Sequence, residues 1–405
     1  MSRRLRIFRW IIRFCSLGAA VFLLVGGPLP LILSGVLPAL SPLGRFTAVI
    51  SGKTWYPALF WGLPAVLFLG LALWRGRVFC RWFCPTGVIG ELARPISLRR
   101  PLVKRRYAGI VFWGVIAASA FGLPLAMIFD PLSAFQRLGH IGHGMYTMTS
   151  LIPGAVVPLI LIAGVCQPSV WCTHICPLGY LFQLCRVKSR SSSVAPDNIR
   201  RDLVKGVFIG TPIALLGRYL NPIKDTAQGR SNSALQVLPP GAGNIDRFSG
   251  LCIRCYACVT ACPTRVISVK YTLSQPMNHI FQPCLDMTRG YCAEFCTECL
   301  KVCPTGAIQR FPLEEKRNLQ LGIAKVHQEI CLSWSEGEHC MVCQEHCSYN
   351  AIESDPTADG LPRPVVLEDL CRGCGACQNK CPALTNRAAI RVEGVTRQRK
   401  LEGSM

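Results

Sequence analysis

The sequence predicts two structurally different parts, an α-helical transmembrane unit of four to five helices followed by a cysteine-rich α+β domain. Half of the 405 residues are hydrophobic and only 16% are charged, which is typical of a membrane protein rather than of an ordinary soluble enzyme. The long apolar stretches are confined to the first 220 residues. Of the 24 cysteines, 17 lie between Cys252 and Cys381, and such a density indicates metal ligation or disulfide bonds.

Five apolar stretches define the predicted helical unit. They are residues 14–33, 57–74, 107–129, 146–166 and 203–220. The hydrocarbon core of a bilayer requires about 20 apolar residues in a helix, so we expect the first four stretches to cross a membrane. The predicted boundaries are 1–199 for the membrane domain, 200–220 for a signal or anchor helix, 221–248 for a linker, 249–395 for the cysteine-rich domain and 396–405 for a basic tail.

The distribution of Lys and Arg predicts an orientation in the bilayer. These residues are frequent before the first stretch and in segments 75–106 and 167–202, but rare in 34–56 and 130–145. Cytoplasmic loops carry the excess of positive charge, so the frequent segments are expected in the cytoplasm of a bacterial inner-membrane protein. The basic residues are thus placed as topology signals for a lipid bilayer, and thiolate-bound clusters would cancel part of the formal charge of +22, so this charge does not predict a nucleic-acid partner.

An arginine pair precedes the fifth apolar stretch. Arg200 and Arg201 stand before a weakly apolar run that ends at Arg218, an arrangement that resembles a twin-arginine export signal, here inside the chain. Such signals export domains that fold around cofactors before crossing. We therefore expect the fifth stretch to anchor a C-terminal domain that lies in the periplasm.

Two cysteine runs have the spacing C-x2-C-x2-C-x3-C-P. The first run is Cys252, Cys255, Cys258 and Cys262, and the last run is Cys371, Cys374, Cys377 and Cys381. This is the bacterial ferredoxin spacing, in which three thiolates bind one [4Fe–4S] cluster and the fourth binds a second cluster. The two runs therefore predict a ferredoxin-like domain.

Two further runs keep the C-x2-C-x3-C ending but have a longer first gap. They are Cys292, Cys296, Cys299 and Cys303, and Cys331, Cys340, Cys343 and Cys347. Cys284 is a possible alternative to Cys292 as the first ligand. Zinc ribbons use two separated cysteine pairs and do not require the third cysteine, so iron is favoured over zinc. Sixteen thiolates predict four [4Fe–4S] clusters in an α+β polyferredoxin domain.

The fourth cysteine of each run must reach a cluster of another run, so the runs must pair. We expect nested pairing, in which the first and last runs pair and enclose a pair made by the two variant runs. Cys381 would then complete the first cluster, and Cys303 would join the cluster of Cys331. The alternative is pairing in sequence order, which the spacing does not exclude.

The motif C-x3-C-P-x-G occurs twice in the helical part. It begins at Cys80 and Cys84, and again at Cys172 and Cys176, in each case after a predicted membrane stretch. Two facing pairs would supply four thiolates for one further iron–sulfur or other redox centre. The alternative is that these cysteines pack as small hydrophobic residues.

Three polar residues fall in the short loop predicted at 130–145. Asp130, His140 and His143 are candidates for deprotonating a quinol, although loop histidines are more often simply solvated.

These motifs resemble two known protein families. The paired C-x3-C-P-x-G motifs on a four-helix unit resemble NapH-type and MauN-type proteins and the related NosR group. Residues 200–390, with the arginine pair and four cysteine runs, resemble the MauM/NapG family of ferredoxin-type proteins, and Cys331-Leu-Ser-Trp before Cys340 is similar to that family's third run. The chain thus resembles a fusion of the two, except that NapH-type proteins carry their own cytoplasmic ferredoxin tail.

The resemblance implies a membrane-anchored iron–sulfur protein that relays electrons between the quinol pool and a periplasmic oxidoreductase or cytochrome c. Quinol would be the diffusible electron donor. Clusters bound only by cysteine carry electrons rather than transform substrates, so no catalytic residue is predicted and the chain is a carrier or a quinol dehydrogenase component. The alternatives are an accessory protein that supplies electrons for cofactor maturation of a periplasmic enzyme, and a membrane ferredoxin that faces the cytoplasm.

Overall fold

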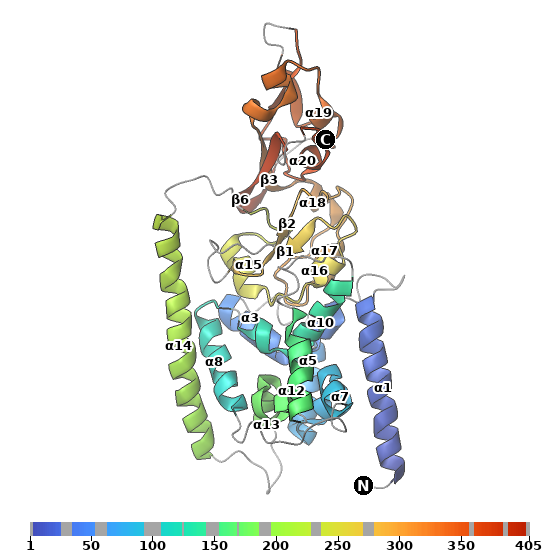
Figure 1. Ribbon diagram of the computed structural model, residues 1–405, viewed down its shortest axis with the longest axis vertical. Coiled ribbons are helices and arrows are strands. Elements are labelled where there is room, and N and C mark those ends of the chain that lie inside the picture. The colour runs from blue at the N-terminus through green and yellow to red at the C-terminus, as the bar shows by residue number, and fades with distance from the viewer. Residues whose placement is uncertain are drawn as a thin grey trace.

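A helical part and a cysteine-rich part lie one above the other in the computed structural model (Figure 1). The structure describes residues 3–25, 35–52, 63–92, 107–123, 125–142, 154–167, 170–185, 196–227, 236–269, 279–355, 360–383 and 388–401. Two long helices, α1 (Arg3–Val25) and α14 (Pro196–Ala227), flank the helical part on opposite sides in this view.

Shorter helices fill the space between α1 and α14. They are α2 (Val36–Ala39), α3 (Pro42–Gly52), α5 (Leu63–Arg75), α6 (Val78–Trp82), α7 (Pro85–Leu92), α8 (Ala108–Ala120), α9 (Ala126–Phe129), α10 (Pro131–Gly142), α12 (Val156–Cys166), the π-helix η2 (Trp171–Ile175) and α13 (Pro177–Leu184). Their core contains Leu43, Phe79, Phe112, Leu132 and Phe182.

The predicted transmembrane unit is wrong. Among the described residues, no helix is both long enough and apolar enough to cross a bilayer. α5 and α8 have 13 residues each and α12 has 11, so each rises by about 20 Å or less, whereas the hydrocarbon core measures about 30 Å. α1 and α14 have 23 and 32 residues, but both include several arginines.

The predicted multi-pass localisation in a bacterial inner membrane, with the C-terminal domain in the periplasm, is corrected for the same reason. It depended on spans that the described helices do not provide. Parts of the expected spans, residues 26–33, 57–62, 124 and 146–153, lie outside the described residues.

Three segments expected as connections contain ordered elements. Residues 131–142 form α10 instead of a loop, and His140 lies in this helix, whereas His143 lies outside the described residues. Segment 75–106 contains α6 and α7. The predicted linker 221–248 contains the end of α14, and its Leu238 is buried in the core of the cysteine-rich part.

The cysteine-rich part is α+β, with three two-stranded antiparallel sheets. Its strands are β1 (Ile267–Val269) with β2 (Pro283–Leu285), β3 (Leu319–Val326) with β6 (Ile390–Lys400), and β4 (Ile352–Asp355) with β5 (Arg363–Val366). Its helices are α15 (Ile245–Leu251), α16 (Ala257–Thr260), α17 (Glu298–Val302), α18 (Leu313–Arg317), α19 (Val342–Glu345), α20 (Ala376–Lys380), the 3-10 helix η4 (Gln328–Ile330) and the π-helix η5 (Leu332–Glu336). β6 extends into the predicted basic tail.

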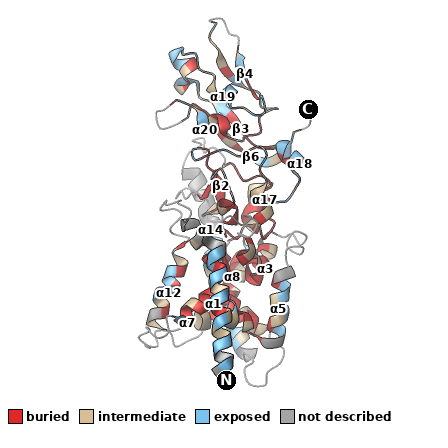
Figure 2. Cartoon of the chain, turned by 90° about the vertical axis from the view of Figure 1, so that its right-hand side faces the viewer, coloured by how far each residue is buried: buried red, intermediate tan, exposed pale blue. Residues whose placement is uncertain are grey.

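The two parts share one hydrophobic core. Ala48 of α3 belongs to the same buried cluster as Phe248 and Leu321 of the cysteine-rich part. Helix α15 packs on α3 so closely that a Cβ at Gly250 would lie 3.1 Å from the carbonyl oxygen of Ser51. Buried residues continue from α3 into the elements around β2 (Figure 2), so the helical part is fixed against the cysteine-rich part.

Candidate iron–sulfur sites

The structure gathers the cysteines of the four runs into four sets of four. We number each set by the run that supplies three of its cysteines. Set 1 is Cys252, Cys255, Cys258 and Cys303; set 2 is Cys292, Cys296, Cys299 and Cys262; set 3 is Cys331, Cys340, Cys343 and Cys381; set 4 is Cys371, Cys374, Cys377 and Cys347. Within each set the thiols lie close enough to affect one another's pKa, or they line one cavity.

The runs pair in sequence order, so the expected nested arrangement is wrong. Cys303 lies with Cys252 and Cys255 instead of with the third run. Cys381 lies with Cys331 instead of with the first run. The reason is that α16 packs on α17 and α19 packs on α20, which brings the loops of adjacent runs together.

Cys292, and not Cys284, lies with the other thiols of set 2. Cys262 and Cys296 act on the pKa of Cys292. Cys284 is buried in β2, where its backbone pairs with Ser268. The choice of Cys292 as a ligand remains a proposal, but the structure brings together the thiols that it requires.

The first and last runs form the same loop with different residues. In the last run, Gly373 and Gly375 have φ angles of 68° and 85°, values at which glycine has no steric penalty. Arg254 and Tyr256 take the corresponding places in the first run with φ angles of 50° and 63°.

Side-chain hydrogen bonds hold these two strained residues. The Arg254 guanidinium donates to the carbonyl oxygens of Cys252 at 2.6 Å and of Ser249 and Ile280 at 3.2 Å each. The Tyr256 hydroxyl donates to the carbonyl oxygen of Phe281 at 3.1 Å. Residues 280–281 therefore support the first cysteine loop although they lie far from it in the sequence. The spacing of the cysteines does not reveal this contact.

The surroundings of the sets fit [4Fe–4S] clusters. Backbone N–H groups point at cysteine sulfurs: Ile308 donates to Cys303 at 3.3 Å, Ala324 to Cys371 at 3.4 Å and Ala351 to Cys347 at 3.2 Å. Such bonds stabilise the negative charge of a thiolate-bound cluster. Sets 3 and 4 border cavities of about 360 and 330 Å³, counted with their open mouths.

The buried thiols require a source of positive charge to ionise. Burial raises the pKa of Cys343 and that of Cys374 to about 12, and bound iron would supply the compensating charge.

Among the residues that the structure describes, no three His, Cys, Asp or Glu side chains converge closely enough to hold a single metal ion.

The two C-x3-C-P-x-G motifs meet in the helical part. The thiols of Cys84, Cys172 and Cys176 all act on the pKa of Cys80, which burial raises well above its ordinary value. We call Cys80, Cys84, Cys172 and Cys176 the inner set. The Arg77 guanidinium joins the two halves, because it donates to the carbonyl oxygen of Gly179 at 2.9 Å and to that of Cys172 at 3.4 Å.

The geometry explains each position of the repeated motif. Cys84 and Cys176 immediately precede α7 and α13, whose first residues are prolines. The next two N–H groups donate to the cysteine sulfur, from Thr86 and Gly87 in one motif and from Leu178 and Gly179 in the other. Proline suits the first helical position because no donor is needed there.

The glycine keeps the two cysteines of each motif close together. A Cβ at Gly87 would lie 2.6 Å from the carbonyl oxygen of Cys80, whereas one at Gly179 would lie 3.4 Å from that of Cys172. The sequence therefore specified both halves of the inner set. The sequence did not indicate that Arg77 belongs to this site, because the basic residues of segment 75–106 were interpreted as signals of membrane topology.

Cysteine loops of this spacing in an α+β domain define a ferredoxin-type iron–sulfur electron-transfer protein. Comparison with family models supports this class. A 4Fe-4S dicluster domain model matches residues 251–307 and 338–384, and a 4Fe-4S binding domain model matches residues 57–106 and 150–192, which include the inner set.

Curated relatives identify the family. Ferredoxin-type protein NapG of Escherichia coli K12 is 32% identical over 214 residues, which are 50% of this chain and 88% of the relative. Methylamine utilization ferredoxin-type protein MauM of Methylorubrum extorquens is 32% identical over 201 residues, 48% of this chain and 88% of the relative. Ferredoxin-type protein NapF of E. coli K12 is 30% identical over 147 residues, 36% of this chain and 80% of the relative.

The chain belongs to the family of ferredoxin-type proteins that includes NapG and MauM. No solved structure matches it. The predicted resemblance to MauM/NapG proteins, the iron–sulfur cofactor and the electron-transfer role are confirmed. The predicted fusion with a NapH/MauN-type unit stays a prediction.

Proposed function

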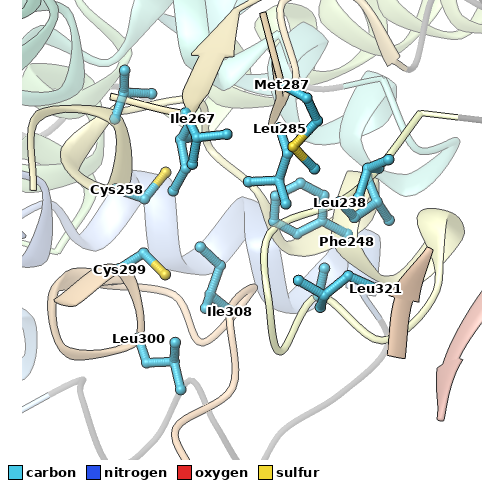
Figure 3. Packing of buried hydrophobic residues seen from close by; sticks show 14 of the residues in the cluster. Leu238, Phe248, Cys258, Ile267, Leu285, Met287, Cys299, Leu300, Ile308 and Leu321 are labelled. Carbon is cyan, nitrogen blue, oxygen red and sulfur yellow. The ribbon is translucent and has the colours of Figure 1, made fainter. Parts of the chain in front are cut away.

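We propose that the chain is a multi-centre electron relay with one [4Fe–4S] cluster in each of sets 1 to 4 and a further iron–sulfur or other redox centre in the inner set. The observation that carries this proposal is the order of the sets in space. Cys299 of set 2 acts on the pKa of Cys258 in set 1, and both side chains lie near Ile267 and Ile308 in the core (Figure 3).

The outer sets continue the same line. The N–H of Cys292 in set 2 donates to the carbonyl oxygen of Cys374 in set 4 at 2.8 Å. Cys343 of set 3 acts on the pKa of Cys377 in set 4. The sets therefore follow the order 1, 2, 4, 3 away from the helical part, an arrangement suited to passing electrons from set to set.

The protein residues in this proposal hold and insulate the clusters. Four cysteines fill the ligand positions of each cluster, which supplies a one-electron couple and no open site for substrate. Buried side chains such as Leu300 and Ile308 exclude water. We therefore assign no catalytic residue.

We further propose that the relay connects the quinol pool to a redox enzyme or cytochrome c. A relay needs one redox partner that gives electrons and another that takes them, and the family resemblance suggests quinol and a redox enzyme or cytochrome c for these two roles.

A second candidate function is supply of electrons for cofactor maturation, supported by similarity to a methylamine utilization ferredoxin-type protein. Deleting the gene would separate the two, because loss of steady electron flux favours a relay and an inactive, immature partner enzyme favours maturation.

Iron and sulfide quantification of anaerobically purified protein tests the cluster assignment. We expect about sixteen irons per chain from sets 1 to 4 and a higher count when the inner set is filled. Replacing Cys80 and Cys172 by serine should remove only the excess, with the electron paramagnetic resonance (EPR) signals of the other clusters retained. A colourless or zinc-loaded protein would contradict the proposal, and clusters that reduced quinol cannot reduce would remove quinol as the donor.

A further inference from the structure

Five arginines surround set 1. They are Arg45, Arg137, Arg247, Arg254 and Arg310. Arg45, Arg247 and Arg310 are close enough to Cys303 for its charge to act on their own pKa. Arg137 is likewise close enough to Cys255, and Arg254 close enough to Cys252, for their charges to interact. Each cysteine named here belongs to set 1.

Two of these arginines come from the helical part. Arg45 lies in α3 and is 5% exposed, and Arg137 lies in α10 and is 1% exposed. Arg45 Nε donates to the carbonyl oxygen of Ala39, at the end of α2, at 3.1 Å. Arg137 Nε donates to the carbonyl oxygen of Ser133, within α10, at 3.2 Å. α10 packs directly against α16, the helix that carries Cys258.

The other three arginines are fixed by the cysteine-rich part. Arg254 is fully buried and bound to the carbonyl groups described above. Arg247 donates to the carbonyl oxygens of Gly306 at 2.8 Å and Ala307 at 2.9 Å. Arg310 Nε donates to the carbonyl oxygen of Leu300 at 3.1 Å.

The other sets are surrounded differently. In set 2, the Lys316 ammonium acts on Cys292, and it also donates to the carbonyl oxygen of Cys296 at 2.5 Å. In set 4, Arg372 acts on Cys371. In set 3, the charges that raise the pKa of Cys343 are those of the other three cysteines of the set. In the part of the chain that the structure describes, set 1 thus has five neighbouring arginines, whereas Lys316 acts on set 2 and Arg372 on set 4.

We propose that these buried arginines make set 1 the site of highest reduction potential among the four sets, so that electrons entering at the outer sets collect beside the helical part. This inference rests on the proposed function. Each transfer moves one electron from a reduced set to its oxidised neighbour, without forming or breaking a bond, and a one-electron redox partner at the outer end is the reductant. The added negative charge is stabilised by nearby fixed cations in a medium of low dielectric constant.

The helical part also links set 1 to the inner set. Asp130, at the start of α10, is 1% exposed and accepts hydrogen bonds from Ser41 at 2.8 Å and from the N–H of Ser133 at 3.2 Å. It acts on both Arg137 and Cys84. The inner set is therefore the expected electron acceptor for set 1.

Replacing Arg137 by methionine tests the proposal, with an EPR-monitored redox titration of the full chain as the measurement. We expect one midpoint, the highest of the four, to move to lower potential while the iron content stays that of the wild type. Arg137→Lys keeps the charge, so its highest midpoint should stay close to that of the wild type. Arg45→Met changes a different helix and should lower the same midpoint. This second variant therefore tests the proposal even if Arg137→Met does not fold.

Two control variants separate a local charge effect from a general one. Arg372→Met should lower a different midpoint, that of set 4. Lys400→Met removes an exposed cation that pairs with Glu315 and should move none, because solvent screens it. Unchanged midpoints in both Arg137→Met and Arg45→Met, or a shift in a midpoint that is not the highest, would overturn the inference. A wild-type protein without [4Fe–4S] signals would instead refute the proposed function.

Discussion

At the scale of single residues, glycines decide whether the inner cysteines can approach one another. Gly87 and Gly90 lie one turn apart in α7, yet only Gly87 faces another backbone segment. A Cβ at Gly87 would lie 2.6 Å from the carbonyl oxygen of Cys80, whereas nothing lies within 4 Å of one at Gly90. The same substitution in one helix should therefore have opposite effects.

We predict that Gly87→Ala destabilises the protein by about 1–3 kcal/mol, because the Cys80 backbone must move away. The variant should also lose the iron or other redox centre bound by the inner set. Gly90→Ala should be neutral or stabilising by up to about 1 kcal/mol, since alanine favours helix. Chemical denaturation and iron content measure both effects, and equal behaviour of the two variants would contradict the role of Gly87.

At the scale of elements, the long helix α14 is held against α8 by backbone contact. Gly206 and Gly210 of α14 face Gly114 of α8, and a Cβ at Gly210 would lie 2.4 Å from the Gly114 carbonyl oxygen. Glycines four residues apart allow two helices to approach this closely. Large apolar side chains such as Phe208, which is 76% exposed, lie elsewhere on α14. The contact with α8 therefore sets the position of this helix.

We predict that Gly210→Ala separates α14 from α8 and lowers the free energy of unfolding by about 1–3 kcal/mol. Limited proteolysis should then cut α14 faster, while the EPR signals of sets 1 to 4 remain. Gly18→Ala is the matched control, because a Cβ at Gly18 in α1 meets nothing within 4 Å. Equal protease resistance of the wild type and Gly210→Ala would show that the glycine contact is not needed.

At the scale of the whole molecule, a shared core keeps set 1 beside the helical part. Ala48 of α3 is 2% exposed and packs within the core of the cysteine-rich part. Phe46, two residues earlier, is 50% exposed. Rigid docking of this kind is required if arginines from α3 and α10 are to act on the thiols of set 1.

We predict that Ala48→Glu uncouples the two parts, because the junction would have to bury a carboxylate without a partner, at a cost of several kcal/mol. Thermal unfolding followed by far-ultraviolet circular dichroism and by visible cluster absorbance should coincide in the wild type and separate in the variant. Phe46→Ser, on the exposed face of the same helix, should leave the two curves coincident. Coincident curves in Ala48→Glu would argue against a shared core.

Much of the site could be predicted because its signals are local. Three cysteines on one loop must have short and regular spacing, and Gly373 and Gly375 mark the left-handed turns of that loop. The repeated C-x3-C-P-x-G motif likewise contains its own helix start. The α+β class of the cysteine-rich part followed from the same runs.

The transmembrane prediction was wrong because an average over an apolar stretch does not show where a helix ends. Residues 107–129 are apolar almost throughout, yet α8 ends at Ala120 and the short helix α9 follows it. Such a bend divides one apparent span into two short helices packed against neighbours. Apolar composition alone therefore does not show how long the helices within such a stretch are.

The sequence by itself determined which cysteines of one run lie close together, because a loop of a few residues brings its own side chains together. Only the tertiary structure decided which run completes each set, the order of the sets in space, and the gathering of five arginines around set 1. Those features join residues such as Arg137 and Cys255, more than a hundred positions apart. Their proximity depends on the packing of α10 on α16, which no local spacing records.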